Sequence, residues 1–285
     1  MNVSVNGLFC LRCILNARLG ELERLLPSDR DAVDHGLSVI EAICREYRRS
    51  KVRAFVEGFR LVKKITGVKD PYLSEKLNGE RIASKLAERL VKHGRASLRR
   101  LIAIAVLGNS FDAYVEGYRF SPEYLDEDLN ALRKTVNDKV VKLLLSANKV
   151  VYLFDNSGEA IFDLLLIEEL QRRGVSVVAV VKGKPFEIDV SLNDVKRLGI
   201  EEIADTIVCS MEEYPAFHDP ALRRLMETAD VVVSKGLANY VSYLETTPKL
   251  GTPVIILLRA KCQPVARSLR VGKGDYVVRL VRPNF

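Results

Sequence analysis

Oxygen-bearing side chains follow two short apolar runs that have the character of buried strands. Asp155 and Asn156 come directly after Val150–Phe154, and Asp189 closes the polar segment that follows Val175–Val181. Carboxylate and amide oxygens are hard ligands that suit divalent cations such as Mg²⁺ or Mn²⁺. A bound metal can activate water and polarise a phosphoryl oxygen. These residue types therefore indicate metal-assisted chemistry on an anionic substrate.

Two lysines occupy equivalent places after later apolar runs. Lys235 follows Val231–Ser234, and Lys261 follows Val254–Leu258. In open α/β sheets, ligands bind beyond the carboxyl ends of the strands, so these ammonium groups could share one crevice with the carboxylates. A lysine can hold phosphate oxygens as a point charge. The combination favours phosphoester hydrolysis.

The same residues have a simpler interpretation. Asp155–Gly158 could be only a turn and a helix cap, because these residue types favour such positions. A helix that begins at Ser157 and Gly158 would alternatively offer backbone N–H donors to an anion. Lysines at strand ends are commonly solvated. Neither a Walker-type loop nor a Gly-x-Gly-x-x-Gly motif occurs. The residues alone thus indicate an α/β protein with a polar cleft.

The elements that must position these side chains fall into two regions. Residues 1–146 show helical periodicity, whereas from 147 to 285 buried strands alternate with helices. We therefore expect an all-helical N-terminal part followed by a three-layer α/β/α Rossmann-like domain that carries the site. The predicted helices of the first region are Leu8–Leu26, Ala32–Tyr47, Ala54–Ile65, Leu73–Val91, Ser97–Leu107 and one long helix, Glu127–Ser146. In the second region, further strands are expected at Ile207–Val208 and Tyr276–Leu280, and helices at Ala160–Arg173, Pro220–Thr228 and Ala238–Glu245.

Composition narrows the class of protein. The 285 residues carry a net charge of +7, with hydrophobic residues at 48%, which predicts a globular chain. No apolar run reaches the roughly 18 residues of a membrane span, and no secretory signal is evident, so we expect a cytoplasmic protein. The basic residues are scattered over amphipathic helices without an arginine-rich tail. This distribution disfavours nucleic-acid binding and fits a small anionic substrate.

The five cysteines do not form the framework of a secreted protein, since their number is odd. Cys10 and Cys13 are three residues apart and should share one helix face. They could pack as small hydrophobic residues, or could form a disulfide or a metal site with Cys44. A four-thiolate zinc site would need another ligand, because only three cysteines lie in the N-terminal half.

Several motifs occur in a fixed order along the chain. Asp155–Asp163 fits D-N-x-G-E-x-x-F-D, Ala229–Tyr240 fits A-D-x-x-x-x-K-G-x-x-N-Y, Leu258–Cys262 fits L-R-A-K-C, and Gly108–Asp112 fits G-N-x-x-D. This series resembles the domain of unknown function 89 family, the damage-control phosphatases. Cys10 and Cys13 are similar to the cysteine pair of its archaeal members. The resemblance covers nearly the whole chain.

The resemblance implies an α/β/α fold with a helical N-terminal part and a phosphatase that depends on Mn²⁺, Co²⁺, Ni²⁺ or Mg²⁺ and removes damaged or surplus phosphometabolites. By position, the metal ligands would be Asp155, Asn156 and Asp189. One departure is that Ile188 stands where the family's N-D-V-T motif has asparagine. A rival alignment would use Asn193–Asp194 instead.

The resemblance also implies roles for the remaining motif residues. Lys235 would join the three metal ligands in the catalytic set and would grip the phosphate. Asn109 and Asp112 could act near the substrate or cap the next segment, and Glu159 could orient a metal-bound water or cap its own helix. The complete predicted substrate-binding set is Asn109, Asp112, Ser157, Gly158, Glu159, Lys235, Asn239 and Lys261.

The preferred hypothesis is a metal-dependent phosphomonoester hydrolase acting on a small phosphorylated metabolite, with either water or Asp155 as the nucleophile. Sugar phosphates, phosphopantetheine derivatives and nucleotides all fit. One alternative is a methyltransferase that uses S-adenosylmethionine, which would need a glycine-rich loop where only Gly158 is present. A second is a non-enzymatic binder of a phosphorylated ligand or nucleic acid.

Overall fold

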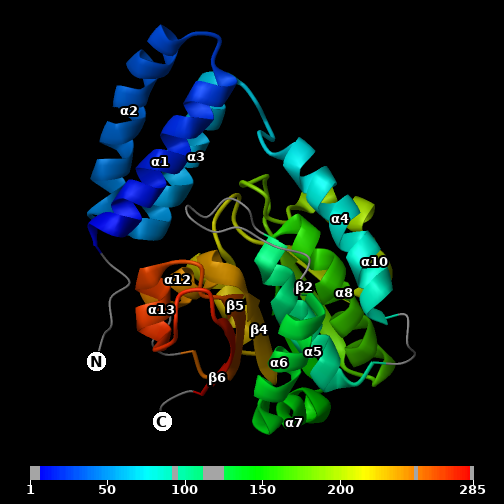
Figure 1. The fold of residues 1–285 in the computed structure, drawn as a ribbon. Helices are drawn as coiled ribbons and strands as arrows, with labels where there is room; N and C mark the ends of the chain where they lie inside the picture. Colours follow the sequence, from blue (N-terminus) through cyan, green and yellow to red (C-terminus); the bar gives the residue numbers. More distant parts are fainter. Residues whose placement is uncertain (1–6, 92–95, 112–124, 247–249, 283–285) are drawn as a thin grey trace.

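The computed structural model describes residues 7–91, 96–111, 125–246 and 250–282. A six-stranded sheet forms its centre, in the order β3-β2-β1-β4-β5-β6 (Figure 1). The first five strands are parallel, and β6 runs antiparallel to β5. The strands are β1 Lys149–Leu153, β2 Ser176–Val181, β3 Thr206–Cys209, β4 Val231–Lys235, β5 Val254–Arg259 and β6 Tyr276–Val281.

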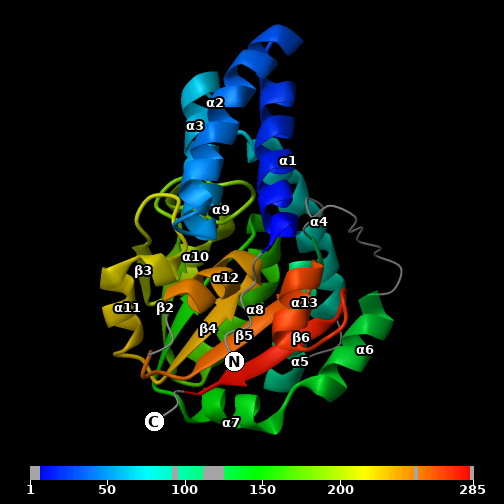
Figure 2. The same ribbon diagram turned by 90° about the vertical axis from the view of Figure 1, so that its left-hand side faces the viewer.

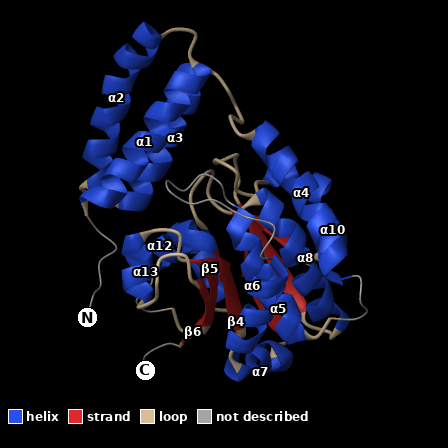
Figure 3. Cartoon of the chain, viewed as in Figure 1, coloured by secondary structure: helices blue, strands red, loops and turns tan. Residues whose placement is uncertain are grey.

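Helices cover both faces of the sheet, as the predicted three-layer α/β/α architecture requires (Figure 3). Along β1, Val150 and Tyr152 pack on one side with residues of α5, α7 and α8, while Val151 and Leu153 pack on the other with residues of α11, α12 and α13. Burial on both faces explains why the strands are continuous apolar runs. The helices are α1 Leu8–Leu25, α2 Asp29–Tyr47, α3 Lys51–Thr66, α4 Leu73–Val91, α5 Leu98–Gly108, α6 Leu125–Thr135, α7 Asp138–Ser146, α8 Ser157–Arg172, α9 Val195–Leu198, α10 Ile200–Ile203, α11 Pro220–Met226, α12 Gly236–Thr246 and α13 Gln263–Leu269.

The N-terminal helices divide into two groups. Helices α1, α2 and α3 pack around their own small core, which includes Leu22, Val39 and Val62, and they stand over one edge of the sheet (Figure 2). Helices α4 to α7 instead contribute residues to the larger core on one face of the sheet, where α4 packs against α8 and α6 packs against α5. The predicted boundary at residue 146 lies just before the first described strand. By packing, however, the helices that form a separate core are only α1–α3, and the helices from α4 onward belong to the core of the sheet. We call α1–α3 the cap.

The predicted helix Glu127–Ser146 is wrong as a single element. The chain forms α6 and α7, separated at Val136 and Asn137. The side chain of Asn137 accepts a hydrogen bond from the backbone N–H of Lys139 at 2.8 Å and so caps α7.

Among the helices of the described ranges, none combines the length and the apolar character that a membrane-spanning helix needs.

Helices α4 and α8 approach each other most closely at two glycines. A Cβ on Gly158 would lie 3.0 Å from the carbonyl carbon of Gly79 and 3.2 Å from its oxygen, whereas a Cβ on Gly79 would lie 3.9 Å from the Cα of Gly158. The contact therefore excludes a side chain from α8 but tolerates a methyl group on α4.

This asymmetry yields a stability prediction. Gly158→Ala should lower the free energy of unfolding by about 1–3 kcal/mol, because the two backbones must separate. Gly79→Ala should leave it unchanged or raise it by up to about 1 kcal/mol, because alanine favours the helix. Urea denaturation of both variants measures the difference. Equal stabilities would show that the helices do not pack as described.

Candidate active site

The polar side chains singled out by the sequence gather where the strand order reverses. β1 and β4 lie side by side at the centre of the sheet, and crevices at such reversals bind ligands in doubly wound folds. A cavity of about 500 Å³ lies between this edge and the cap. Its lining includes Asp155, Asn156 and Asp189. The structure thus brings the three predicted metal ligands to one cavity.

Backbone hydrogen bonds hold the segments that carry these three residues together. Asn156 and Asp189 pair as an isolated antiparallel bridge. On either side of this bridge, the N–H of Val190 donates to the carbonyl of Asp155 at 2.8 Å, and the N–H of Ser157 donates to the carbonyl of Ile188 at 2.8 Å. The loop after β2 is therefore fixed to the turn after β1, and the positions of Asp155, Asn156 and Asp189 depend on one another.

Asp155 is held by the start of α12 and by Asn109. Gly236 has φ +73°, and a Cβ built on it would lie 1.8 Å from Oδ2 of Asp155. The carboxylate thus occupies the space that any other residue would fill at this position. From the opposite side, Nδ2 of Asn109 donates to the same oxygen at 3.1 Å. Glycine after Lys235 is required both by the backbone conformation and by the position of Asp155.

Asn156 occupies the N-cap position of α8, but its side chain makes no capping hydrogen bond. Its Nδ2 points toward Oε2 of Glu159 at 3.4 Å. This contact orients the amide and leaves Oδ1 as the atom that can accept or ligate. The simpler interpretation, in which this side chain is only a helix cap, does not describe the structure.

Asp189 forms an ion pair with Lys182, whose Nζ lies 3.3 Å from Oδ2. Lys182 is itself buried and lies over the ring of Phe186, 5.1 Å from its centroid. In the rival alignment the ligand would be Asp194. Its carboxylate instead accepts hydrogen bonds from Ser191 and pairs with Lys76 at 3.0 Å. Asp194 therefore serves a local cap and an ion pair, which favours Asp189 as the third ligand.

The donor set fits a hard divalent cation. Two carboxylates and one amide oxygen provide oxygen ligands, and the amide of Asn156 is oriented with its oxygen uncommitted to Glu159. Within the described ranges, no three His, Cys, Asp or Glu side chains are grouped so that they could hold a metal ion. The predicted site contains only two such residues, Asp155 and Asp189, and completes its set with an asparagine.

Lys235 does not project into the cavity. Its ammonium group is fully buried and lies 2.5 Å from Oδ1 of Asp163, against Oε1 of Glu159, and 2.8 Å from the carbonyl of Ala105. The predicted direct grip on a phosphate is therefore not what this arrangement shows. Lys235 instead balances two buried carboxylates beneath the predicted metal ligands.

In this buried cluster, the carboxyl groups of Glu159 and Asp163 share one cation, the ammonium group of Lys235. Burial raises the pKa of Asp163 to about 7, and the nearby Glu159 adds to the rise although Lys235 opposes it. Burial alone would lower the pKa of Lys235, but attraction by Asp163 and Glu159 outweighs it and raises the pKa. Lys235 is therefore a permanent cation near neutral pH.

Glu159 links this buried cluster to the cavity. Its Oε2 accepts a hydrogen bond from Nδ2 of Asn109 at 2.8 Å and the longer contact from Asn156. Asn109 in turn holds Asp155 and accepts a hydrogen bond from the backbone N–H of Arg259 at 2.8 Å. Glu159 and Asn109 thus orient the predicted ligands.

The other predicted substrate-binding residues lie in the surrounding framework. Asn239 is buried and donates to the carbonyls of Phe154 and Lys235, both at 3.0 Å, which joins the ends of β1 and β4. Ser157 donates to Glu80 on α4. Lys261 is buried just beyond β5. Gly158 packs on α4, as described above, and Asp112 lies outside the described residues.

A buried arginine attaches the cap to the loop that carries Asp189. Arg18 on α1 is fully buried, pairs with Glu21 at 3.0 Å and with Glu187, and lies over the rings of Phe55 and Phe59. Glu187 has φ +43°, an uncommon conformation for a residue other than glycine, two positions before Asp189. No role was predicted from the sequence for Arg18, Glu187 or Lys182. Lys182 and Glu187 lie in the polar segment that follows the predicted strand Val175–Val181, whereas Arg18 had no such signal.

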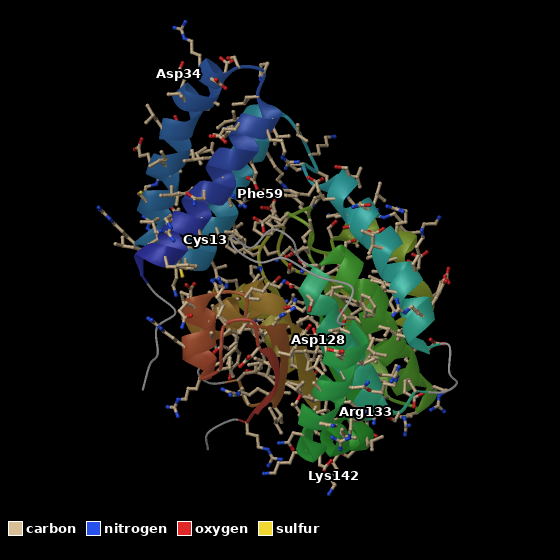
Figure 4. All side chains as sticks on the ribbon, viewed as in Figure 1. Cys13, Asp34, Phe59, Asp128, Arg133 and Lys142 are labelled. Carbon is tan, nitrogen blue, oxygen red and sulfur yellow. The ribbon has the colours of Figure 1, made fainter. Side chains whose placement is uncertain are left out.

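The two N-terminal cysteines of α1 line the same cavity as the predicted metal ligands. Cys10 and Cys13 line the cavity together with Cys262 from the core, and Figure 4 shows Cys13 near the end of α1 that faces the core. No disulfide joins any of the five cysteines, all of which lie in the described ranges, and Cys44 on α2 is exposed. The disulfide considered from the sequence is therefore absent.

Comparison with known proteins agrees with the fold and with the family that the motifs resemble. The family model for the damage-control phosphatase ARMT1-like domain matches residues 9–277. A damage-control phosphatase from Archaeoglobus fulgidus is 32% identical, with 95% of this chain and 98% of that protein covered. A damage-control phosphatase from Pyrococcus horikoshii is 28% identical over 94% of this chain and 95% of that protein. The crystal structure of a DUF89 family protein from Pyrococcus horikoshii superposes with a TM-score of 0.82 at 25% identity, covering 98% of this chain and 99% of that chain.

The protein is of the doubly wound α/β class, with a helical cap and a polar crevice at the switch point of its sheet. Within that class, the chain belongs to the damage-control phosphatase family that shares the ARMT1-like domain. The family predicted from the sequence motifs is thereby confirmed, and so is the predicted fold.

The contact between Gly236 and Asp155 can be tested directly. Gly236→Ala should displace the Asp155 carboxylate and reduce phosphatase activity by about two orders of magnitude, the loss expected when a reacting group is misplaced by about 1 Å. Gly67→Ala is the matched control, because Gly67 has φ +72° but no heavy atom within 4 Å of an added Cβ. Both variants place alanine at nearly the same positive φ, +73° and +72°. Similar activities in the two folded variants would argue against the described position of Asp155.

Proposed function

We propose that this protein is a divalent-metal-dependent phosphatase that hydrolyses a small phosphorylated metabolite in a house-cleaning role. The observation that carries the proposal is the convergence of Asp155, Asn156 and Asp189 on one cavity at the switch point of the sheet. The family to which the chain belongs, and the names of its relatives, support phosphatase activity.

In this proposal, Asp155, Asn156 and Asp189 hold the cation, which is Mn²⁺, Co²⁺, Ni²⁺ or Mg²⁺. When bound, the metal would polarise the phosphoryl group and acidify a coordinated water. Asn109 keeps the Asp155 carboxylate oriented toward the crevice, and Glu159 orients the Asn156 amide. Either water or the Asp155 carboxylate attacks phosphorus, the ester P–O bond breaks and the alcohol leaves with a proton. If Asp155 attacks, a water molecule would then hydrolyse the aspartyl phosphate to release inorganic phosphate.

Two lysines have different parts in the proposal. Lys182 is buried and paired with Asp189, which lines the cavity, and it is the lysine proposed to balance phosphate charge. Lys235 is a positioning residue, because its ammonium group contacts Glu159, which in turn accepts the hydrogen bonds from Asn109 and Asn156. Lys261 remains a predicted substrate-binding residue.

The methyltransferase alternative is disfavoured by the turn after β1. A cofactor-binding loop of that type uses glycines to let the ligand approach the backbone. Here the turn leads directly into α8, and Gly158 is packed against the backbone of Gly79. The glycine is therefore used for contact between helices.

Metal dependence gives the test. Exhaustive chelation should abolish hydrolysis of para-nitrophenyl phosphate, and Mn²⁺, Co²⁺, Ni²⁺ or Mg²⁺ should restore it. In calorimetry without substrate, Asp155→Asn should lose metal affinity, because it removes one of the two carboxylate charges from the proposed ligand set.

The control is Asp205→Asn. Asp205 lies at the other end of the sheet, where it accepts a hydrogen bond from the N–H of Val177 at 2.7 Å, and its substitution should leave metal affinity unchanged. Full activity after chelation, or wild-type metal affinity in Asp155→Asn, would refute the proposed site.

A further inference from the structure

The cavity continues beyond the proposed metal ligands along the underside of the cap, and this part has an apolar wall. Helix α1 contributes Phe9, Ile14 and Ala17, and α3 contributes Val52 and Phe55. On α1 these residues belong to one stripe at helical spacing, so the same face of the helix lines the cavity over most of its length.

The wall opposite the cap is also apolar. Leu237 and Val241 on α12, Val265 on α13 and Pro215 lie on the core side of the cavity. Leu237 and Ala238 directly follow Gly236, which contacts Asp155. The apolar surface is therefore continuous with the proposed metal site.

Three thiols belong to the same surface. Cys10, Cys13 and Cys262 line the cavity, and burial raises the pKa of both Cys10 and Cys262. A thiol with a raised pKa stays neutral at physiological pH and packs as a small hydrophobic group. These cysteines therefore extend the apolar wall.

The two cations of the cavity lining, Arg24 on α1 and Lys51 on α3, are matched by carboxylates. Lys51 lies 3.5 Å from Glu245, and Arg24 lies 2.8 Å from Glu75. A second anionic group on a substrate would have to compete with these carboxylates.

Among the other polar lining residues, Tyr72 donates to Glu21 at 2.7 Å, and Glu21 and Glu187 pair with Arg18. Apart from these paired groups and Asn16, the lining beyond the proposed phosphate centre is apolar.

We propose that the substrate is the phosphomonoester of an apolar alcohol, with an alkyl or aryl group that extends along α1 and α3. This inference rests on the proposed function, because that function places the phosphate at Asp155, Asn156 and Asp189. A hydroxyl-rich sugar in the same space would lose hydrogen bonds to water that Phe55, Val241 and their neighbours cannot replace.

Binding of alkylphosphonates, which are not hydrolysed, tests the inference apart from catalysis. Calorimetry with the Mn²⁺-loaded protein should show affinity rising by about threefold to fourfold for each methylene, so that hexylphosphonate, which is four methylenes longer, binds roughly 80- to 250-fold more tightly than ethylphosphonate. In turnover, hexyl phosphate should have a higher kcat/KM than glucose 6-phosphate.

A pair of glycine variants locates the apolar group. Gly20 lies in the cavity lining on α1, and an added Cβ there meets no heavy atom within 4 Å. Gly20→Leu should fill this part of the cavity and reduce the ratio of the two phosphonate affinities toward one. Gly251→Leu, at an exposed position that also has no heavy atom within 4 Å, should keep the wild-type ratio.

The outcomes separate this inference from the proposed function. Equal affinities for ethylphosphonate and hexylphosphonate, or an unchanged ratio in Gly20→Leu, would overturn the inference even if para-nitrophenyl phosphate is hydrolysed with added metal. A preference for hexylphosphonate that Gly20→Leu removes would support it even if that hydrolysis failed.

Discussion

Lys235 lies fully buried between Glu159 and Asp163, and the polar groups at the switch point are oriented from this cluster outward. Glu159 accepts from Asn109 and Asn156, and Asn109 holds Asp155. Removing one member of a buried ion pair typically costs 3–5 kcal/mol, because the remaining charge is left without a partner. The cluster is thus a constraint on the fold as well as on the geometry of the site.

The backbone supplies a second constraint at the same place. Gly236 follows Lys235 directly, and its missing side chain provides the space for the Asp155 carboxylate. Two adjacent residues therefore have two functions. Lys235 neutralises Glu159 and Asp163, and Gly236 leaves space for the carboxylate of Asp155. The adjacent bridge between Asn156 and Asp189 adds the loop from β2, so that three segments distant in sequence determine one cavity.

The cap completes the cavity from the other side. Arg18 reaches from α1 to Glu187, which is two residues from Asp189, and its guanidinium also lies over Phe55 and Phe59. The position of the cap and the position of the third proposed ligand are therefore linked by one buried side chain. The apolar surface of α1 and α3 faces the same cavity.

Much of this architecture could be predicted from local sequence patterns. Runs such as Val150–Phe154 identify strands buried on both faces, and motif order identified the family. The break between α6 and α7 was not predicted, because the apolar periodicity of the sequence continues through Asn137. Asn137 acts as the N-cap of α7 only because the chain turns there, and the local sequence does not show that turn. The burial of Lys235 was missed because a lysine at a strand end looks the same in sequence whether it faces solvent or two carboxylates. Arg18 had no local signal, since its partner Glu187 is far away in the chain.

The central claim is that Asp155, Asn156 and Asp189 hold one divalent cation at the switch point of the sheet. Anomalous X-ray scattering from crystals grown with Mn²⁺ tests it most directly. The account predicts a single strong peak in the cavity, with oxygens of all three side chains at coordination distance. A peak elsewhere, such as beside Asp194 or among Cys10, Cys13 and Cys262, with none at these three residues, would contradict it.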